Sequence, residues 1–435
     1  MDLRLPGSVA VRSDQQGMLR LNGSLLGRTE WRQVSLAQPM AIESLAVGRS
    51  RLEFRLFGWI PIRRLTVDVV PALRVFPGGQ SIGVRLQSQG VMVVAYASIT
   101  GAGGETRQPA REAGLQVGDV ILRINDRQVN GEEDAARLID DAGQRSRPLN
   151  LAVRRDREVL SYQVSPLKDR ESGRYRIGLY VRDGAAGVGT LTFYDPRTRR
   201  FGALGHVITD VDTNRVIDVR SGEIVQATIS DVERGTRSQP GEKIGLLEST
   251  AIGTIDKNTQ YGIIGTVHQV PDGVLPSEPV PVGLASQVHE GPAEILTVVQ
   301  GRRVERYQIE IQRVLHQPRP DGKGMVIRIT DERLLRRTGG IVQGMSGSPI
   351  LQDGRLVGEV THVFVNDPTR GYGVFIEWML REAGLLFEGA GRTGLGVNRL
   401  RPLFCARRGA AARLASNPAV STIKSHIWWR KETRS

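Results

Sequence analysis

The sequence predicts a mainly β protein of several domains, and three observations lead to this prediction. Glycine is common, at 51 of 435 residues, whereas aromatic residues make up only 5%. Most apolar residues fall in short alternating runs between Gly and Pro residues, a pattern typical of strands joined by turns. Helical spacing of apolar residues is confined to short segments such as 132–142 and 376–383. A chain of this length is expected to form about two to three domains.

The net charge of +13 suggests a nucleic acid or an anionic membrane as a partner, but most of this charge lies in one segment. Residues 388–435 hold ten basic and two acidic residues, which leaves a net charge of +5 on the first 387 residues. The sequence also lacks aromatic-basic stacking motifs, zinc-ligand spacing and a helix-turn-helix pattern. We therefore expect no nucleic-acid partner. The one cysteine, Cys405, excludes an intramolecular disulfide and a cysteine-rich metal site.

The N-terminal residues do not have the pattern of an export signal. Residues 1–15 contain four charged residues and no apolar core, and no stretch reaches the roughly 18 apolar residues that would span a bilayer. We therefore expect a soluble chain, with membrane association only if an anchor precedes Met1.

Four regions follow one another along the chain. Residues 1–72 contain alternating runs such as SRLEFRL (50–56) and are expected to form a β-rich lead-in. Residues 73–168 and 171–386 are expected to form two separate domains. Residues 387–435 are rich in small and basic residues and are expected to be a disordered tail.

Residues 73–168 resemble a PDZ domain. The segment GLQVGDVILRIN (114–125) matches the PDZ signature GLxxGDxIlxIN, and it is followed by the amphipathic helix at 132–142. The resemblance implies that an extended peptide binds as an added strand, next to a loop whose N–H groups capture a carboxylate. By position this loop is Gln80, Ser81, Ile82 and Gly83, where QSIG replaces the usual GLGF. A purely structural β-sandwich is the alternative.

Residues 171–386 contain many short strand-like runs, which predict a β-barrel or sandwich. Within this region, GMSGSP (344–349) resembles the GDSGGP loop of chymotrypsin-like serine proteases. Glycines on both sides of Ser346 would let the chain turn tightly, so that the N–H groups of Gly344 and Ser346 point at one oxyanion. Ser346 is therefore the candidate nucleophile. A simple turn between two strands is the alternative reading.

A serine nucleophile needs a base and a carboxylate that orients this base. His206, in GALGHVITD (202–210), resembles the histidine loop of the same proteases and precedes Ser346 by 140 residues. His268 and His362 lie on strand-like segments and are alternatives. For the carboxylate, the sequence offers Asp210, Asp212 and Asp331, and spacing alone does not decide among them.

Five segments carry a further resemblance, at residues 77–86, 175–183, 189–214, 291–298 and 338–380. They resemble the stage IV sporulation protein B (SpoIVB) family of serine peptidases. It implies a PDZ domain followed by a chymotrypsin-like double β-barrel. It also implies a catalytic triad of Ser346, His206 and Asp331, with Asp210 in reserve. No metal or organic cofactor is implied.

The resemblance further implies a role in sporulation signalling. Members of the family are exported across the inner forespore membrane into the space between forespore and mother cell. There they cleave a membrane-bound regulator of an intramembrane protease, so that a late sigma factor is activated, and they also cleave themselves. A protein substrate and a second copy of the chain are thus the expected partners. A PDZ adaptor with an inactive peptidase fold is the alternative function.

Overall fold

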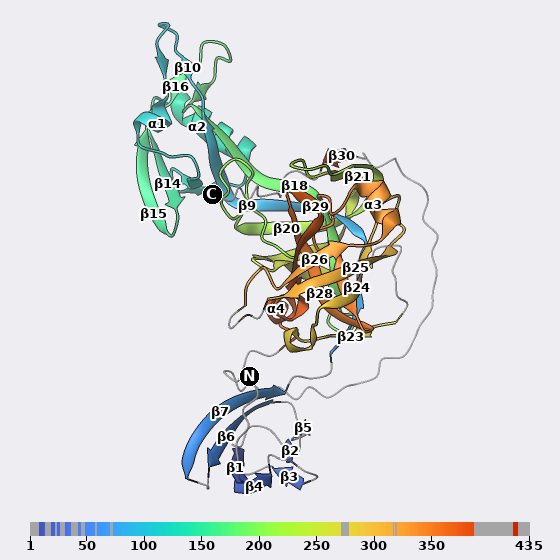
Figure 1. Cartoon of the computed structure of the whole chain (residues 1–435). Coiled ribbons are helices and arrows are strands. Elements are labelled where there is room, and N and C mark those ends of the chain that lie inside the picture. Colours follow the sequence, from blue (N-terminus) through green and yellow to red (C-terminus); the bar gives the residue numbers. More distant parts are fainter. Residues whose placement is uncertain are drawn as a thin grey trace, which may run out of the picture. The chain divides into compact units, whose positions relative to one another are not determined.

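The structure is a computed structural model, shown in Figure 1. It describes residues 8–13, 19–21, 24–26, 31–35, 42–44, 48–56, 59–69, 73–270, 278–315, 317, 320–386 and 421–424. The chain divides into two units, which are described separately. One unit comprises residues 1–73 and 384–416, and the other comprises residues 74–383 and 417–435.

Within the described residues, the N-terminal unit contains seven strands. They form a four-stranded sheet of order β4-β1-β6-β7 and a three-stranded sheet of order β3-β2-β5. The strands are β1 (Ser8–Ser13), β2 (Leu19–Leu21), β3 (Ser24–Leu26), β4 (Trp31–Ser35), β5 (Ile42–Ser44), β6 (Gly48–Leu56) and β7 (Ile60–Val69).

The second unit contains a first barrel of six strands, in which each strand pairs with two others. The antiparallel pairs β9–β18, β18–β19, β19–β22, β22–β21, β21–β20 and β20–β9 close the ring. Alternating apolar residues such as Ile82, Val84 and Leu86 fill its interior together with Phe201. The strands are β9 (Ser81–Tyr96), β18 (Leu179–Tyr194), β19 (Arg200–Ala203), β20 (Val219–Glu233), β21 (Glu242–Thr259) and β22 (Gly262–Val267).

A second closed barrel has the order β24-β25-β26-β29-β28-β27. Its strands are β24 (Gly291–Thr297), β25 (Glu305–Val314), β26 (Met325–Ile329), β27 (Pro349–Gln352), β28 (Arg355–Phe364) and β29 (Asp367–Phe375). Helix α3 (Glu332–Thr338) lies between β26 and β27, and helix α4 (Ile376–Glu382) follows β29. The expected helix at 376–383 is thus confirmed. Strands β8 (Arg74–Pro77) and β23 (Val280–Pro281) pair with each other, and β8 also pairs with β18. The 3-10 helix η1 (Ala285–Gln287) precedes β24.

The PDZ elements are inserted between two neighbouring strands of the first barrel. Figure 1 shows β9 and β18 running side by side from the barrel to the PDZ elements, and their pairing continues from Thr190↔Ser81 to Leu179↔Tyr96. The helices are α1 (Pro109–Glu112) and α2 (Glu132–Gln144). The strands are β10 (Ile99–Thr100), β11 (Thr106–Arg107), β12 (Val120–Ile124), β13 (Arg127–Gln128), β14 (Leu149–Arg155), β15 (Glu158–Val164), β16 (Leu167–Lys168) and β17 (Tyr175–Arg176).

This insertion corrects the expected domain boundary. The prediction gave residues 73–168 to the PDZ domain, but residues 81–87 of β9 pair with β18 and β20 and belong to the barrel. An alternating strand looks the same in sequence whether it lies in a barrel or in a PDZ sheet. The fold class itself, a PDZ domain together with a chymotrypsin-like double barrel, is confirmed.

The PDZ signature residues have clear structural roles. Gly114 and Gly118 adopt positive φ angles of 96° and 92°, which glycine tolerates without strain. Asp119 is fully buried, accepts a hydrogen bond from the amide of Gln116 at 2.8 Å, and forms an ion pair with Arg155 at 2.7 Å. The Gly-Asp turn therefore holds the start of β12 against the end of β14.

Most of the predicted tail, 387–420 and 425–435, lies outside the described residues. Between these ranges, β30 (Ser421–Lys424) pairs antiparallel with residues 244–247 of β21. In the part of the chain that the structure describes, no helix is both long and apolar enough to cross a bilayer.

Candidate active site

The loop that carries Ser346 immediately precedes β27 and is shaped by two glycines. Gly344 and Gly347 have φ angles of 89° and 90°. A Cβ at Gly347 would lie 2.2 Å from the carbonyl oxygen of Thr190, so only glycine fits. Ser346 is 5% exposed, and its Oγ donates a hydrogen bond to the carbonyl of Thr361 in β28 at 2.9 Å. The GMSGSP pattern thus forms a tight loop with a buried serine.

Strand β18 of the first barrel holds this loop in place. The N–H of Thr190 donates to the carbonyl of Ser346 at 3.1 Å, and its Oγ1 donates to the carbonyl of Gly344 at 2.7 Å. Two residues further on, Thr192 Oγ1 donates to the carbonyl of Gly347 at 2.8 Å. Three carbonyls of the loop are therefore fixed by one strand of the opposite barrel.

The predicted oxyanion donors are available. Within the described residues, neither the N–H of Gly344 nor that of Ser346 donates a hydrogen bond to another protein group. Buried loop amides are normally paired. Two unpaired amides, one of them that of the buried serine itself, therefore suit an oxyanion-binding site.

His206 lies in the loop that follows β19 and is 6% exposed. Its Nδ1 lies 2.9 Å from the carbonyl oxygen of Val207. Because a carbonyl can only accept, Nδ1 carries the proton and Nε2 keeps its lone pair. Burial lowers the pKa of His206, while the hydrogen bond to Val207 opposes this shift. The imidazole is therefore neutral at physiological pH and has the state that a general base requires.

The serine and histidine loops pack against each other and against β28. A Cβ at Gly347 would lie 2.4 Å from the N of Leu204, and one at Gly205 would lie 3.0 Å from Cγ2 of Thr361. Ser346 bonds to the backbone of this same Thr361. No hydrogen bond joins Ser346 directly to His206. Apo geometries often tighten only when substrate binds, and the packing brings together the loops of the candidate nucleophile and the candidate base.

The alternative histidines lie in different environments. The ring of His362 stands 5.2 Å from that of His206, measured between centroids, and so belongs to the same site. His268 is exposed at the end of β22, where its N–H donates to the carbonyl of Ile252. Of the three predicted candidates, His206 is the one carried on a loop that packs against the serine loop.

The structure does not bring Asp331 to His206. Asp331 is the N-cap of α3 in the second barrel, where its side chain accepts hydrogen bonds from the amides of Arg333 and Leu334. Its carboxylate also pairs with the Arg333 guanidinium at 2.9 Å. Burial raises the pKa of Asp331, but the hydrogen bonds from Arg333 and neighbouring amides outweigh this effect and lower it overall. Asp331 thus has a helix-capping role, and its place in a triad stays a sequence-based prediction.

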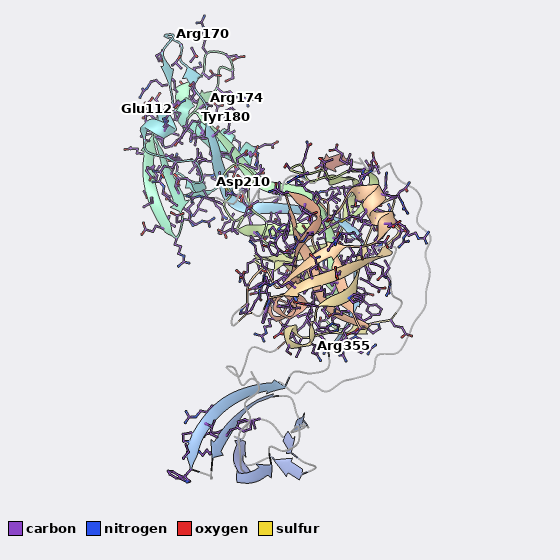
Figure 2. All side chains as sticks on the ribbon, in the orientation of Figure 1. Glu112, Arg170, Arg174, Tyr180, Asp210 and Arg355 are labelled. Carbon is purple, nitrogen blue, oxygen red and sulfur yellow. The ribbon has the colours of Figure 1, made fainter. Side chains whose placement is uncertain are left out.

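The other two candidate carboxylates, Asp210 and Asp212, also pair with groups other than His206. Asp210 (Figure 2) is 2% exposed and pairs with Arg182 at 2.8 Å. It also accepts hydrogen bonds from the amides of Asp212 and Thr213. The side chain of Asp212 pairs with the second terminal nitrogen of Arg182. None of these carboxylates forms a hydrogen bond with His206.

The predicted peptide-binding loop requires a correction. Gln80, Ser81, Ile82 and Gly83 are all buried. Ile82 and Gly83 pair with β18 on one side and with β20 on the other. Because both edges are occupied, the segment cannot receive an added strand, and it forms the start of a barrel strand instead.

A different edge has the geometry that a PDZ domain uses for peptides. The first residues of β18, Leu179–Arg182, pair with β9 on one side and have no strand partner on the other among the described residues. Helix α2 contacts this strand, and the amide of Glu132 donates to Asp183 Oδ2 at 3.2 Å. Tyr180 (Figure 2) is 62% exposed there. The segment RIGLYV (176–181) is the sequence feature from which this edge could have been predicted.

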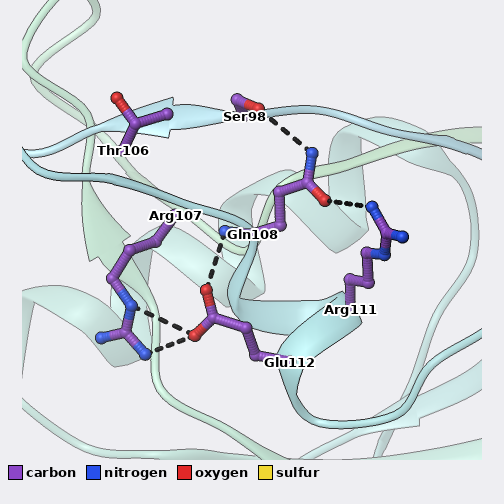
Figure 3. Close-up of a pocket in the computed structure, with 6 residues that line it drawn as sticks. All are labelled: Ser98, Thr106, Arg107, Gln108, Arg111 and Glu112. Carbon is purple, nitrogen blue, oxygen red and sulfur yellow. Dashed lines mark hydrogen bonds and ion pairs between the residues drawn. The ribbon is translucent and has the colours of Figure 1, made fainter.

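The PDZ part also has a shallow surface pocket, shown in Figure 3. Most of its polar side chains are paired with one another: Arg107 with Glu112, and Gln108 with Ser98 and Arg111. Thr106, which also lines the pocket, is drawn without a partner in Figure 3. Within the described ranges, no group of three or more His, Cys, Asp or Glu side chains gathers as a metal site would require.

Sequence reasoning missed two buried ionisable residues near the two loops. Lys243 in β21 is fully buried, and its stem packs against Gly344. Glu359 in β28 is fully buried, and its Cγ lies 2.9 Å from the position of a Cβ on Gly205. Neither residue lies in a catalytic motif, so only the folded chain reveals their positions.

Fold and site together define a serine peptidase domain built from two barrels. Residues 173–380 match the SpoIVB peptidase S55 family, and residues 102–155 match a PDZ domain. The resemblance to this family seen in the sequence is thus confirmed.

Other similarities cover less or are weaker. A predicted zinc metalloprotease of Treponema pallidum (strain Nichols) is 33% identical over 72 residues, which is 17% of this chain and 16% of that relative. The inactive form of the Rv3671c protease is 15% identical over 46% of this chain and 85% of that one, with a TM-score of 0.26. The active form, from M. tuberculosis, is 16% identical over 48% and 78%, with a TM-score of 0.25.

Proposed function

We propose that the protein is a serine endopeptidase that acts by acyl transfer. The observation that carries this proposal is the packing of a buried serine loop, with two unpaired amides, against the loop of a neutral buried histidine. Ser346 attacks the peptide carbonyl, and His206 takes its proton and later passes it to the leaving amine. The amides of Gly344 and Ser346 bind the oxyanion.

The proposed biological role rests on the family match. The enzyme cleaves a membrane-bound regulator between forespore and mother cell, which leads to activation of a late sigma factor, and it also cleaves itself. It reaches this space by export across the forespore inner membrane. The free edge of β18 beside α2 supports a protein substrate or a second copy of the chain, because an extended peptide can add there as a strand.

Cleavage between two copies tests the proposed activity. A tagged Ser346→Ala chain serves as substrate for the untagged wild-type chain, and an untagged Ser346→Ala chain is the control. We expect fragments of the tagged chain with the wild-type protein and none with the variant. Fragments in both reactions would contradict the assignment of Ser346. Intact chain in both reactions would favour the PDZ adaptor instead.

A sporulation assay tests the role. In a spore-forming host that lacks its own enzyme of this family, the exported wild-type chain should restore late mother-cell sigma-factor activity, and Ser346→Ala should not. Equal restoration by both chains would contradict a proteolytic role.

A further inference from the structure

Lys243 is an unusual residue for a protein core. It is fully buried in β21, and its Nζ donates to Thr297 Oγ1 at 2.8 Å and lies 3.4 Å from Ser81 Oγ. Among the described residues, these hydroxyl groups are its only partners, and no carboxylate pairs with it. Burial lowers the pKa of the amine to about 7. Lysine without a carboxylate partner is costly to bury, so its presence calls for a functional reason.

The backbone of Lys243 fixes one peptide unit of the serine loop. Its N–H donates to the carbonyl of Gln343 at 2.9 Å, and the N–H of Gln343 donates to the carbonyl of Gly241 at 2.8 Å. In a planar trans peptide, the carbonyl of Gln343 and the N–H of Gly344 point in opposite directions. The hydrogen bond from Lys243 therefore sets the direction of the Gly344 N–H, which is a proposed oxyanion donor.

The side chain of Lys243 supports the same glycine. A Cβ at Gly344 would lie 3.1 to 3.3 Å from Cβ, Cγ and Cδ of Lys243, so the methylene stem lies against the loop. Beyond this contact, Nζ reaches Thr297 at the end of β24. Ser81, its other neighbour, pairs with Thr190 across β9 and β18. Thr190 holds the carbonyl of Gly344 from the other side.

We propose that Lys243 is a positioning residue for the oxyanion donor Gly344. Its amine links the second barrel, through Thr297, to the strand of the first barrel that holds Gln343. This link keeps the Gly344 N–H directed at the oxyanion site. The inference rests on the proposed function, because it concerns the same nucleophile loop.

The test uses Lys243→Met, which keeps the length of the apolar stem and removes the amine. A fluorophosphonate probe reports the site, because its phosphonyl oxygen occupies the oxyanion site while Ser346 attacks phosphorus. In the full chain we expect the maximal labelling rate to fall about 10- to 100-fold, somewhat less than the loss of a whole oxyanion donor. The probe concentration for half-maximal rate should change less than threefold. Thermal stability should be equal to or above that of the wild type.

Lys257→Met is the matched control. Lys257 lies in the same strand, but its side chain is 51% exposed and its amine bonds to the carbonyl of Glu382. Its labelling rate should equal that of the wild type. If Lys243→Met does not fold, Thr297→Val removes the same hydrogen bond from the other end and should lower the labelling rate in the same way.

Two results would overturn the inference. One is a labelling rate of Lys243→Met within twofold of the wild type. The other is a rate that falls only together with thermal stability, which would mark a structural residue. Failure of the proposed function is distinguishable, because the wild-type chain would then not be labelled at Ser346, whatever the behaviour of Lys243→Met.

Discussion

The two ends of β18 differ in what they contact. At the barrel end, Thr190 and Thr192 hold the serine loop, and the strand is paired with β9. At the PDZ end, Leu179–Arg182 keep one edge without a strand partner among the described residues. A strand of 16 residues spans about 50 Å. One continuous strand thus joins an edge without a strand partner to the loop of the candidate nucleophile.

Matched glycines provide the strongest test of this comparison. Gly347 at the barrel end and Gly178 at the PDZ end have φ angles of 90° and 77°. Added Cβ atoms would lie 2.2 and 2.5 Å from backbone oxygens. We expect Gly347→Ala to lower the fluorophosphonate labelling rate by roughly 100-fold or more, because the oxyanion loop must move. Gly178→Ala should leave this rate within threefold of the wild type. Equal losses would show that the two ends are not separable.

Two buried carboxyl groups sharpen the comparison further. Asp119 in the PDZ part has an arginine and an amide as partners, whereas both oxygens of Glu359 beside the histidine loop lack a hydrogen-bond partner among the described residues. Directly opposite Glu359 on the flanking strands lie Pro349 and Val374. Asp119→Leu should destabilise the fold by about 3 to 5 kcal/mol, because it leaves Arg155 without its carboxylate partner.

Glu359→Met should stabilise the fold by about 1 to 3 kcal/mol, because it removes a buried carboxyl group that lacks a hydrogen-bond partner.

The effect of Glu359 also depends on pH. Burial raises the pKa of this carboxyl group well above its ordinary value of 4.5. The folded chain therefore keeps a proton that the unfolded chain has released, and stability falls as pH rises above 4.5. Thermal unfolding at pH 5 and pH 8 should show a larger gain for Glu359→Met at the higher pH. A gain that shrinks with pH would contradict the burial argument.

The role predicted from the sequence and the role seen in the structure differ most clearly at Asp331. As the N-cap of α3 it accepts two amide hydrogen bonds, so Asp331→Ala should cost about 1 kcal/mol of stability and leave the labelling rate within a few-fold of the wild type. A triad carboxylate would instead lower the rate by roughly 10⁴-fold. A loss of that size at unchanged stability would restore Asp331 to the triad.

The smallest expected effect concerns the acid limb of the pH profile. Burial lowers the pKa of His206 from its ordinary value of 6.5, so the base stays deprotonated into mildly acidic solution. The midpoint of the acid limb in the labelling rate should therefore lie below 6.5. A midpoint at or above this value would mean that His206 is solvated or is not the base.

Local motifs were predictable from the sequence, and long-range pairings were not. GMSGSP and the glycine before His206 follow from turn chemistry, and the structure places both loops together. The QSIG segment was misassigned because its alternation fits either a PDZ strand or a barrel strand. Its true partners lie about 100 and 140 residues away in β18 and β20. Lys243 lies in no motif, and a lysine in a strand normally faces solvent, so its burial could not be predicted.

The most direct measurement maps the site of fluorophosphonate labelling by mass spectrometry in the wild-type chain and in His206→Ala. The structure predicts one labelled residue, Ser346, and a labelling rate that falls by several orders of magnitude without the histidine. Labelling of a different serine, or a rate at Ser346 that does not depend on His206, would contradict the account.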